Sequence, residues 1–192
     1  MPPEGGISRA AFARSFEGQF ASPEMPDLLF KQTYERFNGA WEKAYGWPLF
    51  RPLTGDDEHI LKVLRVPLNE NQLEFDTPVL NLAKILIDSL NEKGLEKSVN
   101  SIEKADKGIT KLEKFASTNG WHGYAQHIAF LRNVQALRSG GAAHRKGKEY
   151  QKAAAPFQVR EKGFVVAAYN LFGGALRLLA YLESQVRAFR PR

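Results

Sequence analysis

The sequence predicts an all-α protein, an up-and-down bundle of about five or six helices. Apolar residues recur at helical spacing in most segments, and no segment of useful length alternates apolar and polar residues as a strand does. With 192 residues, the chain is long enough for one domain with a hydrophobic core. We expect the proline- and glycine-rich residues 1–26 to form a partly ordered arm and residues 27–192 to form a single helical-bundle domain.

The first predicted helix spans residues 27–46. Asp27 is a good N-cap, and the aromatic side chains that follow it share one helical face, which is typical of a helix that packs against a core. After a proline-rich turn, a short helix should begin near Asp56. That residue and its two acidic neighbours suit the positive N-terminal end of a helix dipole.

The next predicted helix spans residues 77–94, with Thr77 as N-cap and Pro78 as the first helical residue. Apolar residues cover nearly its whole circumference, so we expect a central and largely buried helix. Lys84 and Asp88 lie on a single polar stripe of this helix. Because buried charges are costly without a partner, these two residues should pair with each other or line a cleft.

The remaining segments also have helical spacing. Residues 94–120 predict an amphipathic outer helix interrupted at Gly108, and residues 121–139 predict another helix. The chain ends in a long apolar helix within residues 157–192. The pair Gly173–Gly174 in its middle lowers helix propensity, which indicates close approach of another helix and offers a surface for a dimer.

Positive charge gathers in the last third of the chain. Residues 131–192 hold twelve Lys and Arg against three Glu, whereas the first 130 residues carry a net charge of −3. Such asymmetry is typical of a surface that meets an anion, and nucleic acid is the common case. A basic helical face that only keeps a protein soluble has the same composition.

Several classes of chemistry are excluded by what the sequence lacks. The chain has no cysteine, which excludes disulfides, thiolate metal sites and cysteine nucleophiles. It also has no glycine-rich phosphate loop, no dinucleotide fingerprint, no serine elbow and no HExxH motif. We find no apolar run near the roughly 18 residues that span a bilayer, so the predicted location is cytoplasmic and no membrane is expected as a partner.

Arg138 and His144 are the strongest candidates for a site. Arg138 shares the apolar face of its helix, because it follows Leu131 by seven residues and Val134 by four. An arginine held there must find an anion or an interface. On an unbroken helix His144 would diverge from it by about 120° with a rise of about 9 Å. We therefore expect either a bend or tight packing at Gly140–Gly141, or a second subunit, to bring the two side chains together.

The stretch from Arg138 to His144, "RSGGAAH", resembles the R-x(4–6)-H motif of HEPN domains, the higher-eukaryote and prokaryote nucleotide-binding superfamily. In that family the motif lies late in a compact all-α bundle and a long helix follows it. The order of segments over about residues 55–190 is similar here. Ser139 stands where many members have Asn, Asp or His, and Lys146 stands where a subfamily of HEPN toxins has a modified tyrosine.

The resemblance implies a metal-independent endoribonuclease without a cofactor, which acts as a homodimer in defence or stress response. His144 would move protons while an RNA 2′-hydroxyl attacks the adjacent phosphate. Arg138 would stabilise charge on the phosphoryl oxygens, and Ser139 would orient the phosphate. Flanking phosphates would be held by four basic residues, Arg145, Lys146, Lys148 and Arg132. A two-fold dimer lets Arg138 of one subunit meet His144 of the other, and a regulatory protein partner would suit such an enzyme.

Two other interpretations stay open. HEPN-like bundles also serve as non-catalytic nucleotide-binding or protein-interaction modules, in which Arg138 and His144 would bind an anion or join helices. In a purely structural interpretation, Arg138 lies at the C-terminal end of its helix, Gly140 ends that helix and His144 begins the next.

Overall fold

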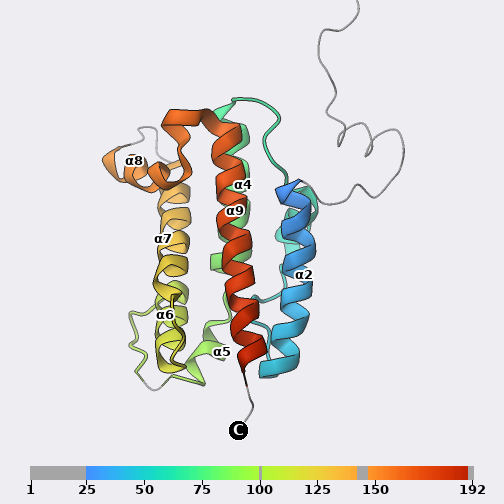
Figure 1. The fold of residues 1–192 in the computed structure, drawn as a ribbon, viewed down its shortest axis with the longest axis vertical. Helices are drawn as coiled ribbons and strands as arrows, with labels where there is room; N and C mark the ends of the chain where they lie inside the picture. The colour runs from blue at the N-terminus through green and yellow to red at the C-terminus, as the bar shows by residue number, and fades with distance from the viewer. Residues whose placement is uncertain (1–24, 100, 142–146, 190–192) are drawn as a thin grey trace, which may run out of the picture.

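The computed structural model describes residues 25–99, 101–141 and 147–189 (Figure 1). These residues form α-helices joined by turns and loops, with no β-strand among them, so the predicted all-α class is confirmed. They contain eight α-helices, and the expected count of five or six is wrong. Five helices have eleven or more residues: α2 (Pro26–Tyr45), α4 (Gln72–Ala83), α6 (Gly108–Thr118), α7 (Tyr124–Gly141) and α9 (Val159–Ala188). The other three are short and lie between the long ones: α3 (Ile60–Val63), α5 (Glu92–Glu96) and α8 (Lys148–Ala154).

The long helices do not alternate in direction along the chain. Helices α2 and α9 lie side by side and run the same way, while α7 runs opposite to α9 (Figure 1). Phe30 contacts Phe172 near the start of α2, and Tyr45 stacks on Phe189 where both helices end, with 4.3 Å between ring centroids. An up-and-down bundle needs short connections between neighbouring helices. The long connection over residues 46–71 returns the chain to the starting end of α2, so the up-and-down prediction is wrong.

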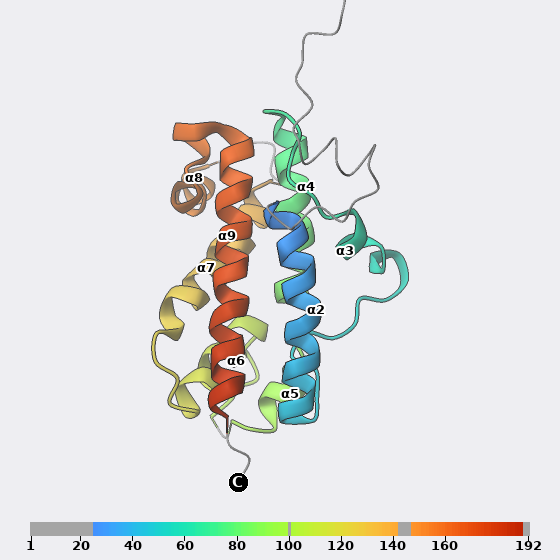
Figure 2. The ribbon, with the colours of Figure 1, turned by 45° about the vertical axis from the view of Figure 1, so that its right-hand side comes forward.

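Helix α9 packs against α2, α4 and α7, with α2 on one side of it and α7 on the other (Figure 2). Its inward face consists of small and apolar side chains that are fully buried, and the facing side of α2 is aromatic. The core therefore combines close helix approach at α9 with large rings from α2. The fully buried residues on these two faces are Phe30, Phe37, Trp41, Ala167, Ala168, Leu171, Phe172, Ala175 and Leu179.

Helix α4 is central and largely buried, as predicted, but it begins earlier than Thr77. Asn71 is its N-cap, and the Asn71 side chain accepts a hydrogen bond from the backbone N–H of Leu73 at 2.8 Å. Pro78 lies inside the helix, and the Thr77 hydroxyl donates to the carbonyl of Leu73 at 2.9 Å. The first five residues of α4 thus come before the predicted start of this helix at Thr77. The helix continues as a π-helical turn, η3 (Lys84–Asp88).

Helix α9 contains a kink at Gly163, where φ is 80°. The carboxylate of Glu70 accepts hydrogen bonds from the backbone N–H groups of Phe164 and Val165, so it caps the straight part of α9 from another segment of the chain. A Cβ atom at position 163 would lie 2.5 Å from a carboxylate oxygen of Glu70. Both the backbone angle and the close contact therefore require glycine at this position.

The glycine pair of α9 does mark a close approach, but to the same chain. The ring of Phe130 from α7 lies against Gly174, where a Cβ atom would be 2.4 Å from the ring. The expected dimer surface at Gly173–Gly174 is therefore wrong for Gly174, which is buried under Phe130.

We expected no apolar run long enough to span a bilayer, but α9 is such a run. By length and composition alone, Val159–Ala188 could cross a membrane, with a mean hydropathy of 1.4 over its most apolar 18 residues. Half of that window is buried inside the bundle, and core helices of soluble proteins pass the same test.

Candidate functional site

Arg138 lies near the end of α7, beside the buried face of that helix. Leu131, Val134 and Leu137 are fully buried, and the side chain of Arg138 is 26% exposed. Its Nη1 donates to Oδ2 of Asp88 at 2.5 Å. The arginine on the apolar face does find an anion, as its position in the sequence predicts, and this anion is a carboxylate of the same chain.

Asp88 ends the π-helical turn after α4 and is held from two sides. Its carboxylate binds Arg138, and its backbone carbonyl accepts a hydrogen bond from Nη2 of Arg51 at 3.1 Å. Lys84 instead pairs with Asp57, with 2.6 Å between Nζ and Oδ1. The expected pair between Lys84 and Asp88 is therefore wrong, because each residue has a partner from a distant segment. Both do line one cleft of about 380 Å³, which was the other expectation for them.

A second hollow, which we call the Arg138 pocket, lies between α4 and α7 and measures about 320 Å³. Its wall on α4 includes Leu80, which is 44% exposed although most of that helix is buried. Arg138 thus lines a mainly apolar hollow, and its partner Asp88 lines the charged cleft. The Arg138 pocket is lined by Leu73, Asp76, Thr77, Val79, Leu80, Leu137 and Arg138.

The glycines after Arg138 do not bend α7, because the helix continues through Gly141. Gly140 allows a close contact instead. A Cβ atom there would lie 2.8 Å from Cδ2 of Tyr150, a buried residue of α8. The tight approach expected at the glycines is therefore made by a side chain of α8. The structural interpretation that Gly140 ends the helix is wrong by one residue, which is within the usual disagreement about helix ends.

The other predicted site residues are only partly brought together. Ser139 is exposed on the last turn of α7, and Lys148 is exposed as the first residue of α8. Arg132 is bound to Glu113 of α6 at 2.5 Å and lies on another side of α7, so it does not join Arg138. Three predicted residues lie outside the described part of the chain: His144, Arg145 and Lys146.

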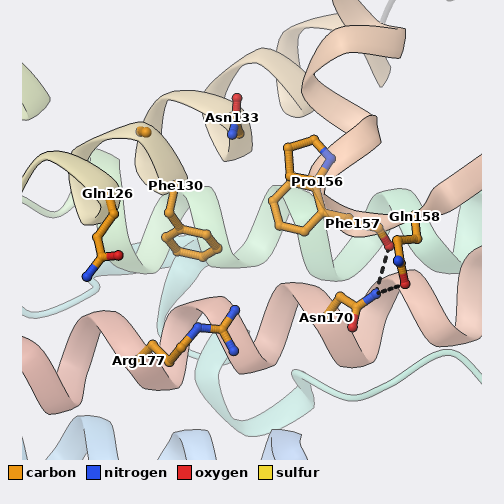
Figure 3. A pocket seen from close by; sticks show the side chains of 9 residues that line it. Gln126, Phe130, Asn133, Pro156, Phe157, Gln158, Asn170 and Arg177 are labelled. Atoms are coloured by element: carbon orange, nitrogen blue, oxygen red, sulfur yellow. Dashed lines mark hydrogen bonds between the residues drawn. The ribbon is translucent and has the colours of Figure 1, made fainter.

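A second candidate site lies on another side of α7 and was not predicted. The groove between α7 and α9 contains an exposed arginine, Arg177, and several amide side chains (Figure 3). The sequence holds a signal that could have indicated it. Residues 114–148 and 162–182 contain no Asp or Glu, and these two stretches supply both walls of the groove.

The described residues form an all-helical protein with two candidate sites beside α7. One contains Arg138 of α7 itself, and the other contains Arg177 of α9. Comparison with protein-family models, with curated proteins and with solved structures finds no match to this chain.

Proposed function

We propose that the protein is a HEPN-like, metal-independent endoribonuclease that cleaves RNA at the end of α7. The observation that supports this proposal is the position of Arg138, whose partly exposed guanidinium lines the Arg138 pocket in a basic part of the chain. An arginine in this setting can present its planar fork to a phosphate.

In the proposed reaction, the RNA 2′-oxygen attacks the adjacent phosphorus and the bond to the 5′-oxygen breaks. His144 accepts the proton of the 2′-hydroxyl, and a proton is returned to the departing 5′-oxygen. Arg138 stabilises the charge on the phosphoryl oxygens, and Ser139 orients the phosphate. The products are a 2′,3′-cyclic phosphate and a 5′-hydroxyl. Flanking phosphates bind Arg145, Lys146 and Lys148.

We propose that the enzyme works as a cytoplasmic homodimer in defence or stress response, under control of a partner protein. A two-fold axis near the ends of the α7 helices would place Arg138 of one subunit beside the partner's His144. Because α7 does not bend before its last residue, a second subunit is the more direct way to join the two side chains.

The ion pair with Asp88 supports a second candidate, a non-catalytic HEPN-like module that binds a nucleotide or a protein. In that case Arg138 joins α7 to the turn after α4, and its charge is already neutralised. The two candidates differ in what Asp88→Asn does. In the ribonuclease the substitution removes a competing anion and strengthens RNA binding several-fold, whereas in the module it changes only stability.

The decisive experiment measures RNA cleavage in EDTA. The wild type should cleave, and His144→Ala should lose about 10²-fold or more of the rate, because general acid–base groups contribute about that much. Arg138→Gln should lose a similar factor. His122→Ala and Arg187→Gln are matched controls, since both residues are exposed and lie away from the end of α7. Cleavage that persists in His144→Ala, or that requires a metal, would overturn the proposal.

A further inference from the structure

The groove between α7 and α9 has the size and lining of a small-molecule site. It measures about 460 Å³, within the range of about 300–1,000 Å³ that such sites occupy. Figure 3 shows its polar wall, with Asn133 on α7 and Asn170 and Arg177 on α9. The segment η4 (Ala155–Phe157) supplies the apolar end of the groove together with Phe130 of α7.

Arg177 has no carboxylate partner, whereas most arginines in the described part of the chain do. It is exposed, and within the described ranges no carboxylate forms an ion pair with it. Five arginines of the described chain do have such a carboxylate: Arg36, Arg65, Arg132, Arg138 and Arg187. The walls around Arg177 carry no acidic residue from 162 to 182 on α9 or anywhere on α7. The groove therefore has a positive charge without a local counter-ion.

The amide groups around Arg177 are partly fixed in place. The Asn170 side chain donates from Nδ2 to the carbonyl of Phe157 at 3.0 Å and to Oε1 of Gln158 at 3.4 Å. These bonds tie the rim of the groove to the start of α9. Asn133 lines the groove from the other wall, on α7 (Figure 3). Amide groups can both donate to an oxyanion and pair with the polar edge of a ring.

The apolar part of the groove depends on the two neighbouring glycines of α9. Gly174 lets the ring of Phe130 lie against the helix, and Phe130 meets Phe157 edge-on, with 6.1 Å between centroids. At Gly173 a Cβ atom would lie 3.4 Å from Nη1 of Arg177 and from no other atom within 4 Å. The guanidinium thus lies over a bare stretch of helix, next to the glycine against which Phe130 packs.

We propose that this groove binds a small organic phosphate with a planar ring, with Arg177 on the phosphate and the ring against the partly exposed Phe130. A phosphate monoester carries about −1.5 to −2 charge near neutral pH, so a positive groove without acidic residues favours it over a singly charged carboxylate. The side chain of Phe130 provides a flat apolar surface for the ring. This proposal does not rest on ribonuclease activity, because the groove shares no residue with the Arg138 pocket.

Isothermal titration of the full chain with adenosine monophosphate tests the proposal, with adenosine and inorganic phosphate as the two halves of the probe. The wild type should bind adenosine monophosphate at least about tenfold more tightly than either half, because phosphate and ring are held together. Arg177→Gln should weaken this binding at least about tenfold. Arg187→Gln is the matched control on the same helix, and it should bind as the wild type does.

The phosphate could come from a free nucleotide or from the 5′ end of an RNA chain. Competition by an oligoribonucleotide with a 5′-phosphate, but not by the same chain with a 5′-hydroxyl, would assign the phosphate to an RNA end. Failure of both to compete would assign it to a free nucleotide. Equal binding of adenosine and adenosine monophosphate, no binding of the latter, or unchanged binding by Arg177→Gln would each overturn the proposal. Since Arg177 is exposed, an unchanged melting temperature would confirm that the variant is folded.

Discussion

Helix α7 presents two different environments to an arginine. On the side of α4, Arg138 is bound by Asp88, which comes from the turn after α4. On the side of α9, Arg177 faces a helix without acidic residues and has amides and rings beside it. The difference does not come from α7, because α7 contains no Asp or Glu. It comes from the neighbouring segment, which supplies a carboxylate on one side and none on the other.

The largest effect should come from the contact between Gly174 of α9 and Phe130, which lines the α7–α9 groove. Gly174→Ala places a Cβ atom 2.4 Å from the ring of Phe130, which must then move in a packed interface. We expect a loss of about 1–3 kcal/mol in the free energy of unfolding, measured by urea denaturation. Gly173→Ala is the matched control, because its Cβ meets only Arg177 at 3.4 Å. It should leave stability unchanged or raise it by up to about 1 kcal/mol. Equal effects of the two substitutions would contradict this description of the groove.

The junction beside Arg138 should respond to Gly140→Ala in a similar way. The new Cβ atom would lie 2.8 Å from Cδ2 and 2.9 Å from Cβ of Tyr150, so α7 and α8 must separate slightly. We expect a loss of about 1–2 kcal/mol in thermal or urea unfolding. Gly39→Ala on α2 is the control, since nothing lies within 4 Å of its Cβ position. A stabilised Gly140→Ala protein would show that Tyr150 does not pack there.

The ion pair between Arg138 and Asp88 should contribute much less to stability. Its side chains are 26% and 48% exposed, and pairs in such positions contribute less than about 1 kcal/mol. A double-mutant cycle with Arg138→Gln and Asp88→Asn measures this coupling from unfolding free energies. A coupling of several kcal/mol would instead mean that the pair is mainly structural, which favours the non-catalytic module.

The smallest effect should be a pH dependence at His127, which lies next to the groove. Burial lowers the pKa of His127 below its ordinary value of 6.5, and the positive charge of Arg177 lowers that pKa further. The unfolded chain therefore takes up the proton first, and stability should fall as the pH drops below about 6.5. Nuclear magnetic resonance of the ring protons should show the pKa of His127 rising in Arg177→Gln. An unchanged pKa would mean that Arg177 points away from His127.

Much of the fold followed from the spacing of apolar residues. That spacing predicted the all-α class, the central helix after Pro78 and the inward position of Arg138, because a buried helical face leaves a local pattern. The start of α4 was missed because Thr77 and Pro78 form a strong local start signal, while the actual cap is Asn71. Helix directions were missed because they depend on how a long connection folds, which has no periodic signal.

The sites were less predictable than the fold, for a physical reason. The partners of Asp88 and Lys84 lie 50 and 27 residues away in the sequence, so no local spacing identifies them. In the sequence, Arg177 is a single charge within an apolar helix. The signal that marks it as a site residue is the absence of acidic residues on α7 and on residues 162–182 of α9. Paired helical stretches without Asp or Glu are therefore the pattern in the sequence that indicates this groove.

The chemical nature of the RNA ends tests the central claim most directly. A short RNA incubated with the protein in EDTA should yield fragments with a 2′,3′-cyclic phosphate and a 5′-hydroxyl, detected by mass spectrometry. These ends follow from attack by the 2′-oxygen without a metal. Fragments with a 3′-hydroxyl and a 5′-phosphate, or intact RNA, would contradict the ribonuclease mechanism proposed for Arg138 and His144.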